Sequence, residues 1–285
     1  MFWHTLIVAL VFFLTREHAA ELAVQAAKSG INSAFVTVVI FLILFALLVL
    51  AFRTLLFLGE QVEKEMEKER STKAHAHTLC DQALSNEISR ISLEPSVKGD
   101  ADRMATAHRT MRELVRATYQ TFESAYGQVS KGQERNDFEV TYMTKSLRDN
   151  QLTVAAAANK DNRMPRSMVL REQQPDIYDQ TVTADIYRAS SPRIVIICDT
   201  SNEKYNELYP EQKRRIKSSI VFPVLTPDYK LLGALVVHCD KARFFSQEKE
   251  KYFSDLLEIF GKRIALEAVR IKRIVDASNA ADAPF

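Results

Sequence analysis

Glycine, cysteine and the common catalytic motifs are all scarce in this sequence. Its 285 residues include only seven glycines and three cysteines. So few glycines cannot form several phosphate-binding loops, and no Walker, Gly-x-Ser-x-Gly, His-Glu-x-x-His or Gly-x-Gly-x-x-Gly motif occurs. Three widely spaced cysteines supply neither a disulfide framework nor a four-cysteine zinc site. We therefore expect reduced thiols, no cofactor and no enzymatic activity.

Metal and nucleic-acid binding are not expected either. His75, His77 and Cys80 carry zinc-binding groups, but residues two apart on a helix point in different directions and cannot converge on one ion. The 38 basic and 36 acidic residues give a formal net charge of only +2. This charge is too small to favour binding to a polyanion.

Two long apolar runs lie near the N-terminus. No charged residue occurs between positions 29 and 52, and a span of this length exceeds the roughly 20 residues that cross a bilayer, so residues 31–58 are predicted to form a transmembrane helix. The first run, residues 1–14, would reach only about 22 Å as a helix, against about 30 Å of hydrocarbon. A cleaved signal peptide is the alternative, but no Lys or Arg precedes its apolar core and no clean small-x-small site follows it. We therefore expect a two-helix transmembrane hairpin over residues 1–58.

The basic residues around these runs predict the orientation, because positively charged segments stay on the cytoplasmic side of a membrane. Most of them follow the second run. They are Arg53, Lys64, Lys68, Arg70 and Lys73 after it, and Arg16 and Lys28 between the runs. We therefore expect a protein of the cell inner membrane, in contact with the lipid bilayer, whose C-terminal domain is cytoplasmic.

Residues 59–99 are predicted to form a helical linker. Their apolar stripe is interrupted for about two turns and does not sustain heptads, so self-association through this segment should be weak. The stretch from Pro95 to Gly99 ends the helix. A domain of residues 100–275 and a tail of residues 276–285 follow.

The domain combines helical and strand patterns. Apolar residues at three- and four-residue steps predict helices over residues 100–126 and from Ser246, the expected N-cap, to about residue 275. Residues 176–189 are compatible with a helix. Apolar or alternating stretches predict strands over residues 138–144, 152–158, 193–198, 219–225 and 231–239. This order predicts an α+β fold with an antiparallel sheet and flanking helices.

Three stretches of this domain together resemble a GAF domain. They are YDQTVTADIYRASSPRIVIICD from Tyr178, KSSIVFPVL from Lys217, and LLGALVVHCDKARFF from Leu231, which leads into the final helix. The resemblance implies a sensory module that binds a small ligand between the sheet and the helices and loops crossing one face. It also implies terminal helices that pair, so a homo-oligomer is expected. The Asn-Lys…Phe…Asp-Glu signature of cyclic-nucleotide-binding members is missing.

The resemblance further implies a set of ligand-binding residues. For Asp199, a second interpretation is that it helps to start a helix before Thr200. The basic cluster that includes Arg215 favours an anionic ligand, and a solvated face is the alternative. Cys198 lies in a predicted buried strand with no adjacent His, so covalent bilin attachment is not expected. The implied set is Tyr178, Thr181, Thr183, Tyr187, Cys198, Asp199, Arg215, Ser218 and Phe222.

The sequence leaves only a short tail after the final helix, so we expect output through the membrane segments or through a separate partner. The leading hypothesis is a sensor or effector that binds a small ligand, either anionic or a nucleotide, and relays binding to its transmembrane helices. One version is a second-messenger-activated effector that disrupts the membrane, as in bacterial antiviral defence proteins of similar layout. The alternative is a non-catalytic regulatory or scaffold subunit that dimerises through the domain and controls a separate membrane or signalling partner.

Overall fold

The computed structural model divides into two units, residues 1–68 and residues 69–285, and each is described by itself. The described positions are residues 21, 24, 25, 28, 33–93, 99–127, 135–147, 150–161, 181–201, 205 and 210–281. The first apolar run lies outside these positions, and with it the predicted hairpin.

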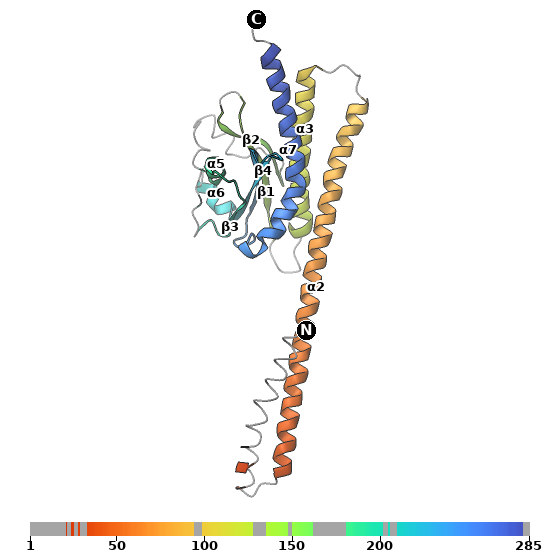
Figure 1. Ribbon diagram of the computed structural model, residues 1–285, viewed down its shortest axis with the longest axis vertical. Coiled ribbons are helices and arrows are strands. Elements are labelled where there is room, and N and C mark those ends of the chain that lie inside the picture. The colour runs from red at the N-terminus through yellow and green to blue at the C-terminus, as the bar shows by residue number, and fades with distance from the viewer. Residues whose placement is uncertain are drawn as a thin grey trace. The chain divides into compact units, whose positions relative to one another are not determined.

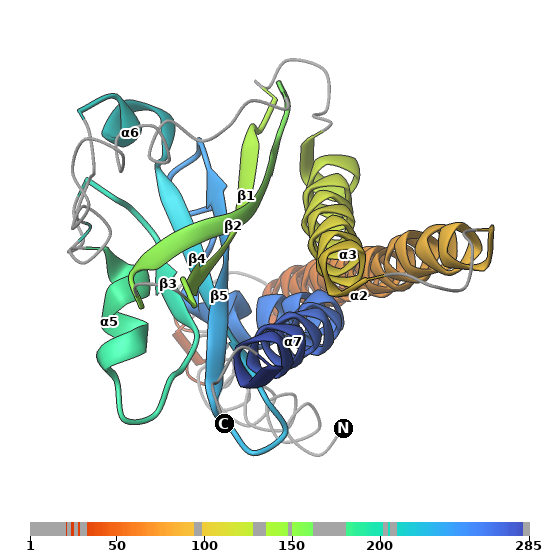
Figure 2. The same cartoon turned by 90° about the horizontal axis from the view of Figure 1, so that it is seen from above.

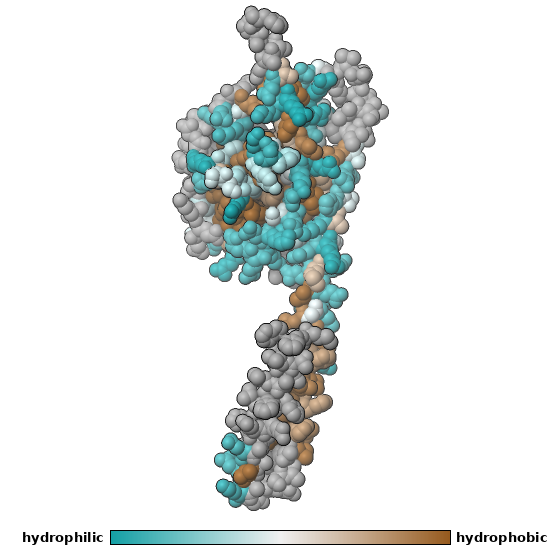
Figure 3. Space-filling model, viewed as in Figure 1, coloured by the Kyte–Doolittle hydropathy of each residue, from teal (hydrophilic) through white to brown (hydrophobic). Residues whose placement is uncertain are grey.

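One helix, α2, spans Ser33–Leu93 and contains 61 residues. It joins the predicted transmembrane helix to the predicted linker without a break at Gly59. Large apolar side chains between Val38 and Leu58 are exposed along it, and some of them are visible in brown in the lower part of Figure 3. Within the described part of the chain, α2 is the helix that is long and apolar enough to cross a membrane by length and composition.

The second unit contains a five-stranded antiparallel sheet with the strand order β2-β1-β5-β4-β3. The strands are β1 (Phe138–Lys145), β2 (Leu152–Asn159), β3 (Val195–Ile197), β4 (Ser218–Leu225) and β5 (Leu231–Cys239). The predicted antiparallel α+β fold is confirmed. The edge strand β3 is shorter than predicted, because only three of its residues pair with β4 and Cys198 already lies in a bend.

The described helices of this unit flank the sheet (Figure 1). They are α3 (Asp100–Phe122), α5 (Val182–Arg188), α6 (Pro210–Arg215) and α7 (Glu250–Ala281), with a π-helical turn, Glu123–Gly127, directly after α3. The final helical segment is longer than predicted. It begins with a 3₁₀ turn, Gln247–Lys249, and α7 then continues beyond Val275. Ser246 is the N-cap of that turn, but its side chain makes no capping hydrogen bond.

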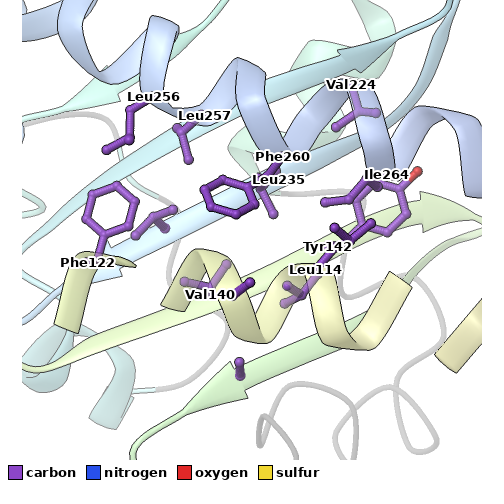
Figure 4. Close-up of a cluster of buried hydrophobic side chains, with 14 of the residues drawn as sticks. Leu114, Phe122, Val140, Tyr142, Val224, Leu235, Leu256, Leu257, Phe260 and Ile264 are labelled. Atoms are coloured by element: carbon purple, nitrogen blue, oxygen red, sulfur yellow. The ribbon is translucent and has the colours of Figure 1, made fainter. Parts of the chain in front are cut away.

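Helices α3 and α7 cover one face of the sheet, here called the helical face (Figure 2). Alternation along the strands places Val140, Ile220 and Leu235 in the core on this face. Figure 4 shows these strands packed against side chains of the two helices, including Leu114 and Phe260, which are fully buried. Burying one such side chain stabilises a fold by about 1.5–3 kcal/mol, so this face carries most of the apolar core.

The other face of the sheet, here called the open face, has a smaller apolar cluster that includes Val154, Ile186, Val221 and Val236. Helices α5 and α6 lie on this side (Figure 2). Because they are only seven and six residues long, they cover less of the sheet than α3 and α7 do. Among the described residues, the open face is therefore the less covered of the two.

Small residues attach the C-terminal part of α2 to the domain. Ala76, Cys80 and Ala83 recur at steps of four and three residues and are buried in the helical-face core. The Cys80 thiol lies 3.9 Å from the carbonyl oxygen of Ile259 in α7. The sequence pattern predicts a linker for this segment, because alanine and cysteine give only a weak apolar stripe. In the structure, packing of the domain already begins on α2, before Asp100.

Candidate functional site

A row of polar side chains crosses the open face near α6. Strand register pairs Glu139 of β1 with His238 of β5, and His238 with Ser219 of β4. Directly opposite residues on one face of a sheet have Cβ atoms about 4.5–5.5 Å apart. The three side chains therefore lie side by side, although they come from distant parts of the sequence.

His238 is the centre of this row. Its Nδ1 atom lies 2.9 Å from the hydroxyl oxygen of Ser219, which is fully buried. Burial lowers the pKa of His238 to about 4. The ring is thus neutral at pH 7, and its hydrogen bond to Ser219 fixes its orientation.

Glu139 is the acidic member of the row. Burial raises the pKa of Glu139, and the nearby Arg215 guanidinium acts in the opposite direction. The closest approach between Arg215 Nη2 and Glu139 Oε2 is 4.0 Å, which is too long for a hydrogen bond. The carboxyl group is therefore mostly removed from water, yet it is only loosely paired.

A cavity of about 280 Å³ lies over this end of the sheet. Its described lining residues come from the start of β1, the end of α6 and the end of β5. They are Asp137, Phe138, Glu139, Arg214, Arg215, Ile216, His238, Cys239 and Asp240. Acidic, basic and neutral hydrogen-bonding residues thus line one small space, and convergent polar groups in a cavity mark a candidate binding site.

Three of the residues implied by the family resemblance belong to α5 or its N-cap. The Thr181 hydroxyl accepts a hydrogen bond from the Ala184 amide at 3.3 Å and caps the helix. Thr183 is buried in the first turn. The Tyr187 hydroxyl donates to the Leu232 carbonyl at 3.2 Å, and burial raises the pKa of Tyr187 to about 12. These contacts hold α5 in place and lie away from the lining of the cavity.

Four others surround β3 and β4. The Asp199 carboxylate accepts the Ser201 amide at 2.9 Å and forms a turn. The Ser218 hydroxyl donates to the Lys241 carbonyl at 2.7 Å. Cys198 and Phe222 pack against the helical-face core, and the Phe222 ring contacts α7 at Gly261, where a Cβ would lie 2.8 Å from it.

Arg215 is therefore the one described member of the implied set that lines the cavity. Tyr178 lies outside the described residues. The set implied by the family resemblance does not include Glu139, Ser219 or His238. A usable signal was present, because Glu139 and His238 are ionisable residues within otherwise apolar strands, and a buried ionisable residue requires a partner.

A second polar group joins α2 to the domain and is here called the joint. The Tyr126 hydroxyl of the π-helical turn and the Tyr252 hydroxyl of α7 lie 2.5 Å apart, and Thr72 of α2 hydrogen-bonds both. The Lys73 ammonium donates to Asp255 at 3.0 Å and lies 5.5 Å from the centre of the Tyr252 ring. The joint therefore ties α2, α7 and a π-helical turn together, and such turns are frequent at functional sites.

A five-stranded antiparallel sheet with two long helices on one face places this domain in the α+β class. The chain belongs to the GAF domain family, whose model matches residues 106–267, more than half of the sequence. GAF domains are ligand-binding sensory domains. No curated protein matches the sequence.

The chain is also similar to solved structures, at low sequence identity and low TM-score. A free methionine-R-sulfoxide reductase from Neisseria meningitidis is 17% identical, with a TM-score of 0.37, and the match covers 62% of this chain and 96% of that one. A putative GAF sensor protein from Burkholderia vietnamiensis is also 17% identical, with a TM-score of 0.33 and coverage of 60% and 99%. The GAF domain of an Acinetobacter phosphoenolpyruvate-protein phosphotransferase is 14% identical, with a TM-score of 0.39 and coverage of 72% and 96%.

The low pKa of His238 predicts a pH dependence of stability. A histidine in an unfolded chain titrates near pH 6.5, whereas folded His238 titrates near pH 4. Between these values the unfolded state binds more protons, so stability decreases as the pH falls. The His238 contribution lost by pH 4.5 is at most about 3 kcal/mol, because each tenfold difference in proton affinity is worth about 1.4 kcal/mol.

Urea unfolding of the wild type and of His238→Gln at pH 7.5 and pH 4.5 measures this effect. The stability of the variant should fall less over this pH range, because glutamine does not titrate. Other titrating groups, including His108 and Glu139, are present in both proteins and cancel in the comparison. An equal loss of stability in both proteins would contradict the assignment.

Proposed function

We propose that the chain is a membrane-anchored, non-catalytic GAF sensor that binds a small ligand on the open face and relays binding to α2. The observation that carries the proposal is the continuity of α2. One helix contains both the exposed apolar stretch from Val38 to Leu58 and the buried residues Ala76, Cys80 and Ala83 of the domain core.

Membrane anchoring is supported by the size of the apolar stretch. Large exposed apolar surfaces are rare on soluble proteins and mark membrane or protein contacts. The stretch is also longer than the roughly 20 residues that span a bilayer. We place the protein in the inner membrane with the GAF domain in the cytoplasm, because the basic residues after the stretch outnumber those before it.

The relay is supported by the joint. A rigid helix transmits a shift at one end to the other only if that end is fixed to the part that moves. Lys73 and Thr72 fix α2 to α7 through Asp255, Tyr252 and Tyr126. Because α7 also packs against β4 and β5, a ligand that shifts these strands shifts the base of α2 through direct contacts.

A sensory rather than catalytic role is supported by the chemistry of the cavity. A catalytic base works best with a pKa near the operating pH, and the pKa of about 4 for His238 is far below it. The size of the cavity, about 280 Å³, favours a small ligand over a cyclic dinucleotide. A shift of α2 is the common first step of two possible outputs, which are disruption of the membrane and control of a separate partner.

Charge placed in the apolar stretch tests the anchor. We expect Leu47→Lys combined with Leu48→Lys to move the protein from the carbonate-resistant membrane fraction to the soluble or aggregated fraction. Each lysine at a helix centre costs about 2.5–3.5 kcal/mol on insertion. Leu266→Lys is the control, because Leu266 is equally apolar and 61% exposed, but lies on α7. Retention of the double variant in the membrane would contradict the anchor.

Ligand binding and relay are tested with the full-length chain in dye-loaded vesicles. Cyclic mono-, di- and trinucleotides and common metabolites are screened for thermal stabilisation, since a ligand at 100 times its Kd adds about 2.7 kcal/mol. We expect a stabilising ligand to change vesicle permeability or the oligomeric state. Tyr252→Phe should bind with similar affinity but respond less, because it lacks a hydroxyl of the joint. Stabilisation by none of the compounds would contradict the sensor and favour the scaffold alternative.

A further inference from the structure

We infer that the cavity beside α6 binds a small zwitterion of the α-amino acid class, with its ammonium group on Glu139 and its carboxylate on Arg215. The inference rests on the proposed function, because it names the ligand of the same site. It depends on the size of the cavity, on the charges that line it and on the spacing of its two central charges.

The volume sets the size of the ligand. Pockets for drug-sized ligands usually measure about 300–1,000 Å³, and this cavity measures about 280 Å³. The cavity lies at the lower limit of this range, so its size favours a small metabolite over a cyclic dinucleotide.

The charges of the lining exclude ligands of a single sign. Arg214 and Arg215 line the same cavity as Glu139. A simple anion would lie against buried Glu139, and a simple cation would lie against two guanidinium groups. A ligand with one charge of each sign matches both sides and places no unpaired charge next to the buried Glu139 carboxyl group.

The other two acids of the rim already have partners. The Asp240 carboxylate accepts the Asp137 amide at 2.9 Å, and the Asp137 carboxylate lies 3.9 Å from the Lys160 ammonium. Glu139 differs from Asp137 in burial, because its side chain is 20% exposed whereas that of Asp137 is 54% exposed. It is the carboxylate best placed to accept a hydrogen bond from a ligand.

The spacing of Glu139 and Arg215 fits two charges on neighbouring carbon atoms. Charge-assisted hydrogen bonds between nitrogen and oxygen are about 2.7–2.9 Å long, so the 4.0 Å contact is well short of that strength. An α-amino acid replaces it with two such bonds, one from its ammonium to Glu139 and one or two from Arg215 to its carboxylate. The Arg215 side chain is 67% exposed and has room to turn toward the ligand.

His238 contributes a neutral surface next to Glu139. Ser219 holds the Nδ1 side of the ring, and a neutral imidazole does not repel the ammonium group of the ligand. A charged histidine in this position would compete for Glu139. The Ser219 and His238 pair is therefore a positioning element that keeps the carboxylate available.

The test is a thermal-shift and calorimetric screen of the full-length chain in detergent. The probes are the natural amino acids, glycine betaine, and cyclic mono- and dinucleotides. Three analogues of the amino acid that binds best are then compared with it. The amide lacks the negative charge, the deaminated acid lacks the positive charge, and the N-trimethyl form lacks the N–H donors. We expect each of these three analogues to bind at least tenfold more weakly than the parent.

Variants test the named residues. We expect Glu139→Gln and Arg215→Gln each to weaken binding of that amino acid at least tenfold. Lys230→Gln should leave binding unchanged, because Lys230 is 80% exposed on the β4–β5 turn and pairs with Asp228. The melting temperature of each ligand-free variant shows whether the variant folds. The analogue series uses only the wild-type protein, so it tests the inference even if a variant does not fold.

The outcomes separate this inference from the proposed function. Binding of a nucleotide, of a simple anion or of the deaminated acid as tightly as the amino acid would overturn the zwitterion and leave the sensor intact. Unchanged amino acid binding in Glu139→Gln would overturn the assigned site. Binding of none of the probes or of other metabolites would overturn both the inference and the sensor.

Discussion

Burial of the central strands β5 and β4 on both faces is the constraint on which the rest of the structure depends. Strand β5 reads LLGALVVHC, and from Gly233 to Val237 every residue is buried. Helices α3 and α7 cover the helical face with large side chains, of which Leu114, Phe260 and Ile264 are fully buried. Short helices and the polar row remain on the open face. This unequal covering of the two faces separates the part of the domain that holds the fold from the part that faces a ligand.

The polar row reduces the stability of the fold, which indicates that it has a functional role. An unsatisfied polar group buried in a protein costs about 1–3 kcal/mol, and a purely structural sheet would place valine or isoleucine at these positions. His238 and Ser219 satisfy each other, whereas the charged partner of Glu139 among the described residues, Arg215, lies 4.0 Å away. A buried carboxyl group with so distant a partner, next to a cavity, marks a candidate functional site.

The sequence predicted the sheet well, because strand patterns are local. The starts and ends of β1, β2, β4 and β5 follow from alternation and from turn residues such as Pro227. The packing of α2 was missed, because Ala76, Cys80 and Ala83 are small and do not form the strong stripe that marks a buried helix. The site was largely missed for a different reason. Glu139, Ser219 and His238 are neighbours only through strand register, and a single sequence contains no direct signal for which strands pair.

The central claim is that ligand binding on the open face alters the joint at the base of α2. Hydrogen–deuterium exchange of the full-length chain in vesicles, with and without a stabilising ligand, tests it most directly. The account predicts changed protection in three places: the cavity strands, residues 250–260 of α7 and residues 72–83 of α2. Changes confined to the cavity strands and α6, with residues 72–83 unaffected, would contradict it.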